Sequence, residues 1–314
     1  MKKLLIITAA ALLITALATI GAGFYMLSFS LSPDANRHDT DSAYRQLHDN
    51  YPVAWAWADS MKSCGSLRDT FVTMPTGERH HALYARNDSA HGRTAVIVHG
   101  YKDCAIKFLY LGRMYHHDLG FNILMPDLHA HGLSEGDAIQ MGWKDRLDVL
   151  HWMAVAERLF RRPAEASQMV VHGVSMGAAT TMNVSGEELP QYVRWFVADC
   201  GYTGVWDEFA LQLKEMFGMP QFPLMHVTSM LCNARYGWTF EEASPIRQVA
   251  RCNRPMLFIH GDSDTFVPYS MAMPLYKAKQ GEKSLWTTHG TRHARSFHDY
   301  PEEYVKRVKN LLGQ

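Results

Sequence analysis

The chain has 314 residues, of which 47% are hydrophobic, so it is long enough to build one large domain with a sizeable core. Lysine plus arginine and aspartate plus glutamate each number 31, and this zero net charge offers no support for nucleic-acid binding, which needs a basic face. Five cysteines without close pairing do not describe a disulfide framework, and which of them pair stays open.

The first predicted element is an apolar segment at the N-terminus. Lys2 and Lys3 precede an uncharged, mostly apolar run over residues 4–31, which exceeds the ~20 residues that cross a bilayer. We interpret residues 1–31 as a signal anchor that binds the membrane and leaves the catalytic domain outside the cytoplasm. A signal peptide cleaved after Ala18 is the alternative, and it would make the protein secreted or periplasmic.

Residues 32–65 form a polar and aromatic linker with a helical segment, and residues 66–314 are predicted to be the main domain. The main domain is predicted to begin with a β-hairpin whose turn is at residues 76–78. The predicted helices are residues 143–160, a helix that begins at Met176, and residues 301–312. The predicted strands are 67–74, 81–86, 94–99, 121–125, 168–172, 193–198, 255–260 and 284–288.

Strands that alternate with helices predict an α/β fold with a mainly parallel sheet of about eight strands and helices on both faces. The continuous, β-branched run at 94–99 is typical of a strand covered on both sides. Folds of this kind carry their chemistry at the carboxyl ends of the strands. We therefore expect the active site among the residues that directly follow these strands.

The alternation fails between residues 202 and 249. This stretch is rich in methionine and phenylalanine, and Pro220 and Pro223 interrupt it. Ordinary helical packing would explain most of these side chains. We predict instead a lid of short helices that shapes the substrate pocket, because long insertions in compact domains are commonly functional.

The sequence Gly173-Val174-Ser175-Met176-Gly177 lies between a predicted strand and a predicted helix. A GxSxG sequence in this setting indicates a strained turn that exposes a nucleophilic serine, with glycines where side chains would not fit. The N–H of Met176, at the start of the helix, would face a developing oxyanion.

With this motif in place, the chain resembles the α/β-hydrolases, and the resemblance extends from Thr70 to the C-terminus. More narrowly, it is similar to exported or membrane-anchored bacterial serine hydrolases akin to acylglycerol lipases and serine aminopeptidases. The segments that carry the resemblance are His99-Gly100-Tyr101, Pro126-Asp127, His131-Gly132-Leu133-Ser134, Gly173–Ser175–Gly177, Asp199-Cys200-Gly201-Tyr202, His260–Pro268 and His293-Ala294-Arg295-Ser296.

The resemblance implies a triad of Ser175 as nucleophile, Asp264 as acid and His293 as general base, in the chain order serine, acid, histidine. His289 and His298 are the alternative candidates for the general base. Asp262 competes with the acid, and we interpret it as a turn residue. The oxyanion donors would be the backbone N–H groups of Tyr101 and Met176.

Other residues are given structural roles. Asp127 precedes the serine, so we expect it to order the loop that contains His131 and Gly132. His80-His81 and His116-His117 lack the spacing of a zinc site, and we expect no metal and no cofactor. A catalytic role for Cys200 is not expected beside a serine turn.

These features predict hydrolysis of a carboxylic ester through an acyl-enzyme intermediate, with a small-molecule substrate. Cleavage of an amide or peptide uses the same triad and stays open. A non-catalytic binding protein on the same fold is the alternative from another class, and fluorophosphonate labelling would distinguish it.

Overall fold

The structure is a computed structural model that describes residues 1–314, and its chain contacts divide it into two units. One unit, which contains the sheet, comprises residues 33–203 and 245–314. The other comprises residues 1–32 and 204–244, and we call it the helical unit.

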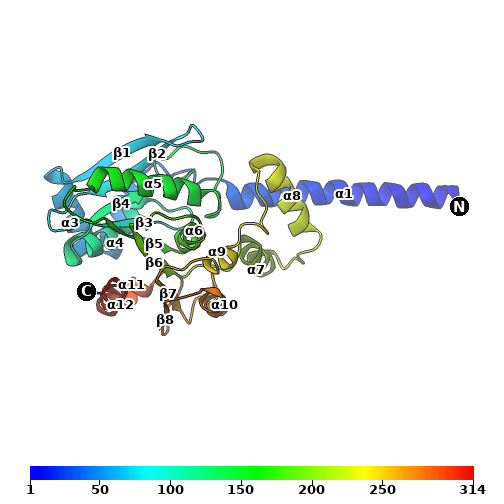
Figure 1. The fold of residues 1–314 in the computed structure, drawn as a ribbon. Helices are drawn as coiled ribbons and strands as arrows, with labels where there is room; N and C mark the ends of the chain where they lie inside the picture. The colour runs from blue at the N-terminus through cyan, green and yellow to red at the C-terminus, as the bar shows by residue number, and fades with distance from the viewer. The chain divides into compact units, whose positions relative to one another are not determined.

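Eight strands form a single sheet in the order β1-β2-β4-β3-β5-β6-β7-β8 (Figure 1). Strand β2 is antiparallel to both of its neighbours, and every other neighbouring pair is parallel. The predicted mainly parallel sheet of about eight strands is therefore confirmed. The strands are β1 Leu67–Thr73, β2 Arg79–Ala85, β3 Arg93–Val98, β4 Asn122–Pro126, β5 Gln168–Val174, β6 Val193–Asp199, β7 Met256–Gly261 and β8 Lys283–Thr288.

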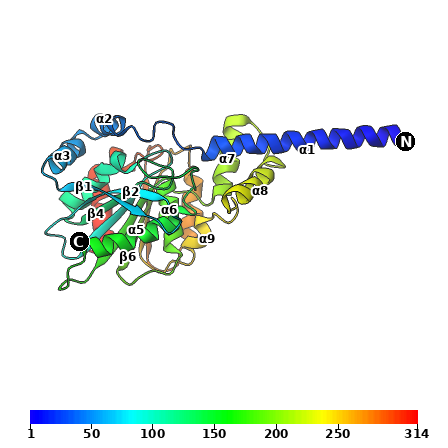
Figure 2. The same ribbon diagram turned by 90° about the horizontal axis from the view of Figure 1, so that it is seen from above.

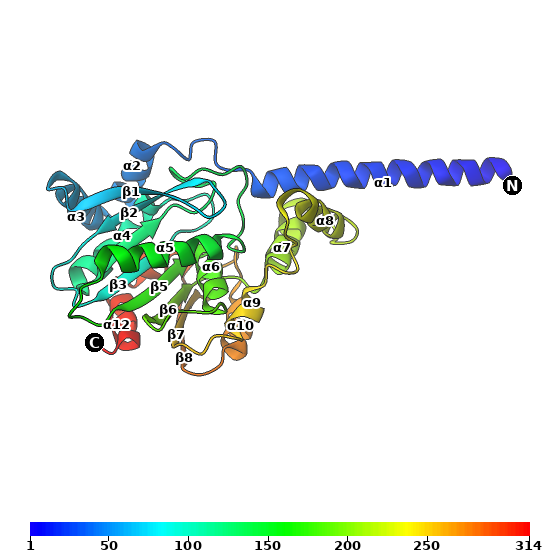
Figure 3. The same cartoon turned by 45° about the horizontal axis from the view of Figure 1, so that its top comes forward.

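The central strands are buried on both faces because helices cover each side of the sheet. Every residue of β4 and β7 is buried, which agrees with their mainly apolar sequences. Helices α3 (Pro52–Ser63), α4 (Leu109–Arg113) and α12 (Pro301–Leu312) share one buried cluster with Ala95 and Ile97 of β3. Helices α5 (Asp145–Phe160) and α6 (Met176–Ser185) cover the other face (Figure 3).

The remaining elements of this unit are short, apart from α2, and several were not predicted. The segment between β3 and β4 passes from 3₁₀ through α to π geometry, and its three pieces of four or five residues are too short and too buried to show a helical period. These elements are α2 Thr40–Asn50, η1 Ala105–Phe108, η2 Met114–Asp118, α9 Pro245–Val249, η3 Tyr269–Met271, α10 Ala272–Ala278 and α11 Ser296–Asp299.

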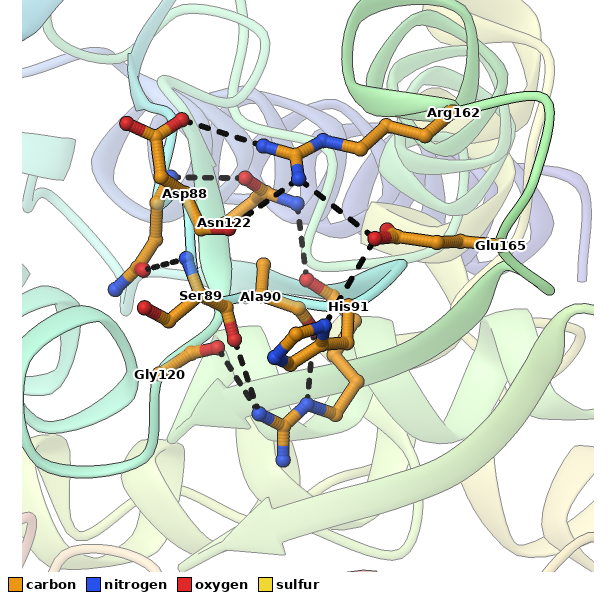
Figure 4. Close-up of polar contacts among 10 residues, drawn as sticks. Asp88, Ser89, Ala90, His91, Gly120, Asn122, Arg162 and Glu165 are labelled. Atoms are coloured by element: carbon orange, nitrogen blue, oxygen red, sulfur yellow. Dashed lines mark hydrogen bonds and ion pairs between the residues drawn. The ribbon is translucent and has the colours of Figure 1, made fainter.

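A polar network joins the loops at the amino ends of β3, β4 and β5 (Figure 4). Arg162 lies 3.2 Å from Asp88 and 3.7 Å from Glu165. The side chain of Asn122 accepts a hydrogen bond from the N–H of Asn87 at 2.9 Å and donates one to the carbonyl of Arg93 at 3.1 Å. These groups bond to one another at the edge opposite the carboxyl ends of the strands, so the network holds loops together.

The helical unit consists of α1 (Lys2–Leu31), α7 (Val205–Phe217) and α8 (Leu224–Tyr236) (Figure 2). Gly23, Leu27 and Leu31 form a buried stripe along α1 at a spacing of four residues. A side chain at Gly23 would meet Leu231 at 3.0 Å and Val227 at 3.1 Å, so this glycine lets α1 lie close against α8.

The break between α7 and α8 contains Pro220 and Pro223, where the sequence predicts an interruption. The predicted lid range of 202–249 extends beyond the helical unit at both ends, because this part of the unit comprises residues 204–244. Residues 245–249 form α9, which packs on α6 in the sheet unit, where Gln248 lies against Gly186.

Helix α1 is long and apolar enough to cross a membrane. It has 30 residues, a mean hydropathy of 2.4 in its most apolar window, and no buried residue in that window. Its length, composition and position near the N-terminus are compatible with a signal anchor or a signal peptide.

Candidate active site

The turn after β5 holds Ser175 in a conformation that few residues with a side chain adopt, at φ 59° and ψ −122°. The flanking glycines are required by close backbone contacts. A Cβ at Gly173 would lie 1.9 Å from the carbonyl oxygen of Gly177, and a Cβ at Gly177 would lie 2.1 Å from that of Val98. The N–H of Ser175 donates to the Asp199 carbonyl at 2.8 Å, which ties the turn to β6.

Ser175 and His293 lie within hydrogen-bond distance although 118 positions separate them in the chain. The Ser175 Oγ is 2.8 Å from His293 Nε2, and His293 Nδ1 is 2.7 Å from Asp264 Oδ2. The structure thus brings the three predicted triad residues into one hydrogen-bonded series. In this arrangement the imidazole can take a proton from the serine while the carboxylate holds its tautomer.

The carboxylate of Asp264 has four hydrogen-bond or ion-pair neighbours. Its Oδ1 accepts the N–H groups of Phe266 and Val267, each at 3.0 Å, and its Oδ2 lies 3.5 Å from His260 Nε2 and 2.7 Å from His293. Burial by itself would raise the pKa of Asp264, but the hydrogen bonds from the two histidines outweigh it, and the net pKa is lowered. Asp264 is therefore ionised at neutral pH.

The competing residues lie in other networks. Asp262 accepts hydrogen bonds from the N–H of Gly290 at 2.7 Å and pairs with His289 at 2.9 Å, so it closes the turn after β8. His298 contacts Arg295 and Asp299. Neither His289 nor His298 forms a hydrogen bond with Ser175, whose histidine partner is His293.

Asp127 lies inside the loop that follows β4 and is fully buried. It accepts the N–H groups of Ala105 at 2.7 Å and Leu133 at 2.9 Å, and it pairs with His81 at 2.7 Å. A Cβ at Gly132 would lie 2.1 Å from its carboxylate, so only glycine fits there. Asp127 orders this loop, as expected.

The loop after β3 runs beside the nucleophile turn. Val98 pairs with Gly173 in the sheet, and a Cβ at Gly100 would lie 3.5 Å from the Ser175 Cβ. The His99 ring is buried and accepts the Leu128 N–H at 3.0 Å, so its role is to join two loops. Tyr101 follows in this loop, and Met176 is the first residue of α6, where a helix has N–H groups without partners in the helix.

Cys200 is also close to the triad, and its thiol lies within 4.8 Å of the ligand atoms of Asp264 and His293. Burial raises the pKa of this thiol well above its ordinary value. It therefore stays protonated and is a poor nucleophile compared with a histidine-bonded serine.

Two neighbours of the site were not singled out from the sequence. His260, the polar residue near the end of the buried strand β7, donates toward the Val267 carbonyl at 2.8 Å and borders Asp264. Phe266 packs its ring 5.1 Å from that of His293. A groove of about 560 Å³ opens beside His293 and is lined by Thr265, Phe266, Gly290, Arg292, Arg295 and Asp299.

The sequence of the chain is similar to those of known proteins. A sequence model of the prolyl oligopeptidase family matches residues 115–312. The uncharacterized protein YqkD of Bacillus subtilis (strain 168) is 26% identical over 321 residues, which cover 99% of this chain and 97% of that protein.

Solved structures show the same architecture. The Pyrococcus furiosus esterase Pf2001 has a TM-score of 0.63 at 22% identity and covers 81% of this chain and 94% of its own. The Pyrococcus horikoshii acylaminoacyl peptidase has a TM-score of 0.59 at 16% identity and covers 79% of this chain but 40% of its own. At such identities the likeness establishes the fold, and the predicted α/β-hydrolase fold is confirmed.

Proposed function

The chain belongs to the prolyl oligopeptidase family and is a serine hydrolase, and from this premise we propose that it cleaves a carboxylic ester through an acyl-enzyme on Ser175. The observation that carries the proposal is the series from Ser175 through His293 to Asp264, with contacts of 2.8 and 2.7 Å. The first distance allows proton transfer from the nucleophile to its base, and the second allows the carboxylate to hold the imidazole in one tautomer.

In the first half of the reaction the Ser175 Oγ attacks the ester carbonyl carbon, and its proton passes to His293 Nε2. The C–O bond to the alcohol then breaks, and the alcohol leaves with the proton from His293. In the second half His293 takes a proton from water, the hydroxide attacks the acyl carbon, and the Ser175 Oγ leaves with that proton. Asp264 holds the Nδ1–H of His293 in place throughout.

The negative charge on the tetrahedral carbonyl oxygen needs fixed donors. We assign the backbone N–H groups of Tyr101 and Met176 to it. This assignment is supported by the position of Gly100 against Ser175 and of Met176 at the start of α6. Loss of one such donor costs about 2.7–4 kcal/mol of transition-state stabilisation.

The share of each solved structure that this chain covers supports an ester substrate over a peptide substrate. This chain accounts for 94% of the Pyrococcus furiosus esterase but for 40% of the acylaminoacyl peptidase. The family match favours amide or peptide cleavage as the second candidate, since the family is one of peptidases. Both substrates use the same acyl-enzyme chemistry.

The predicted signal anchor and lid complete the proposal. We propose that α1 anchors the protein in a membrane with the catalytic domain outside the cytoplasm, which its exposed apolar residues support. We also propose that the lid residues within 202–249 select among substrates by their acyl chains. An ester with an apolar acyl group fits both features.

The test combines a substrate panel with a nucleophile variant. We expect the purified chain to hydrolyse chromogenic esters of varied chain length faster than aminoacyl anilides. Ser175→Ala should abolish both turnover and labelling by a fluorophosphonate probe and leave the far-UV circular dichroism unchanged. Labelling that persists in Ser175→Ala places the nucleophile elsewhere, and faster anilide cleavage selects the peptidase.

A further inference from the structure

A second cluster of titratable side chains, which shares no residue with the triad, lies between β2, the loop after β4, and α5. It consists of His80, His129 and Asp148, all buried. One ligand atom from each lies within 4.8 Å of the other two. His80 Nδ1 is 3.8 Å from Asp148 Oδ2, and the two imidazole rings are 5.4 Å apart.

His80 is the residue in this cluster that needs an explanation. It is 0% exposed, and neither of its ring nitrogens has a hydrogen-bond partner. A buried polar atom without a partner has a free-energy cost, because it gives up its hydrogen bonds to water without replacement, so such atoms are rare in folded proteins. A polar ligand that fills the space between these side chains would remove this cost.

Other buried histidines of the chain do not share this feature. His81, the next residue on β2, points to the opposite face and bonds Asp127 at 2.7 Å and Asp69 at 2.9 Å. His172 bonds two tyrosine hydroxyls, at 3.0 and 2.8 Å. The missing partners are therefore particular to the site around His80.

We propose that His80, His129 and Asp148 bind a divalent transition-metal ion, with zinc as the first choice. Two imidazoles and one carboxylate are a donor set that zinc accepts, and imidazole nitrogens favour zinc-class metals over magnesium or calcium. Glu78 is a candidate for the fourth position, because its buried Oε2 has no hydrogen-bond partner and its charge acts on both histidines.

The spacing suits such an ion after small side-chain rotations. Ligand atoms ~2.1 Å from a common tetrahedral ion lie ~3.4 Å apart, and the His80–Asp148 contact is 3.8 Å. The ion would join a strand, a loop and a helix that are distant in the sequence. Its role is therefore structural, and it takes no part in the chemistry at Ser175.

The experiment measures metal content directly. Full-length protein, purified in detergent without a polyhistidine tag, is stripped with a chelator, incubated with Zn²⁺, desalted and analysed by mass spectrometry of its metals. We expect about one zinc per chain, and a Tm that zinc raises and the chelator lowers again. His80→Leu and Asp148→Asn should lose the bound zinc, while His117→Asn, which removes an exposed histidine, should keep it.

Two results would overturn the site. One is a wild-type chain that retains no zinc after desalting and shows no zinc-dependent Tm. The other is a folded Asp148→Asn or His80→Leu variant that retains as much zinc as the wild type. Should His80→Leu fail to fold, Asp148→Asn, which preserves the shape of the side chain, and the wild-type Tm measurement still decide the question.

Discussion

Ser175 illustrates how a single residue is held in an unfavourable backbone conformation. A non-glycine residue at φ 59° and ψ −122° costs ~1–3 kcal/mol, and such strain persists only where the surroundings impose it. Here β5 enters the turn paired on both sides, α6 leaves it, and the Ser175 carbonyl accepts the N–H of Ala179 at 3.0 Å. The turn therefore presents the hydroxyl to His293 without rearrangement.

Asp264 and Asp262 form a matched pair for testing the triad acid. Asp264→Asn should lower kcat by about 10²–10⁴, because an amide no longer holds the reactive tautomer of His293. Asp262→Asn should have a much smaller effect, since Asp262 contacts His289 and Gly290 in a surface turn. Steady-state kinetics on one chromogenic ester compares the two, and a larger loss for Asp262→Asn would make the assignment wrong.

His172 should make stability depend on pH. It is buried between Tyr115 and Tyr304, and burial lowers its pKa from 6.5 to about 3. Between these values the unfolded chain binds a proton that the folded chain does not, so stability rises with pH across this window and is lost as the pH falls. One such group contributes up to ~1.4 kcal/mol per pH unit.

His172→Gln removes one such group and should reduce the slope of Tm against pH between about 4.5 and 6.5. The slope should not vanish, because burial also lowers the pKa of His80 and His131. His117→Gln, at an exposed histidine, serves as the control and should leave the slope as in the wild type. An unchanged slope in His172→Gln would mean that other groups govern acid unfolding.

At the scale of elements, the helical unit exposes many large apolar side chains. Its most exposed large side chains include Phe222 at 74% and Met230 at 71%. Within the unit, a cavity of about 40 Å³ lies between α1, α7 and α8, and its lining includes Met26, Phe29, Phe217 and Met225. The residues that line it are the ones we expect to influence substrate choice.

Phe217→Ala and Met225→Ala should change kcat/KM for long acyl esters more than for the smallest acetate ester. The reason is that apolar contact stabilises a bound acyl chain by ~25 cal/mol per Å² of area removed from water. Met230→Ala is the matched control, because this exposed methionine of α8 does not line the cavity. Equal effects across the ester series, or a loss of stability alone, would assign these residues to ordinary packing.

At the scale of the whole molecule, α1 is the feature on which the proposed membrane anchoring depends. Its first twenty residues are almost entirely exposed, while Gly23, Leu27 and Leu31 are buried. A helix of 30 residues is ~45 Å long, which exceeds the ~30 Å hydrocarbon core of a bilayer. One end can therefore span a membrane while the other packs on α8.

If α1 is an anchor, full-length protein should sediment with membranes and resist extraction by high salt, because apolar burial is not screened by ions. Detergent should release it. N-terminal sequencing that begins near Thr19 in cell-derived protein would show a cleaved signal peptide instead.

Local patterns in the sequence were sufficient for much of this protein. The eight strands could be predicted because unbroken apolar runs and turn residues are short-range signals. The nucleophile turn could be predicted because the GxSxG pattern between a strand and a helix is a local signal, although the contact that requires Gly177 is with Val98 of the neighbouring strand. The triad residues were proposed from family resemblance, and their catalytic roles remain predictions.

Tertiary structure decided what depends on contacts between distant segments. Nothing local shows that His80 has no partner while its neighbour His81 has two, because burial and pairing depend on α5 and the loop after β4. Likewise, only packing shows that Gly23 of α1 faces α8, more than two hundred residues away. Sequence periodicity reports which face of an element is apolar, but the partner of that face is set by the folded chain.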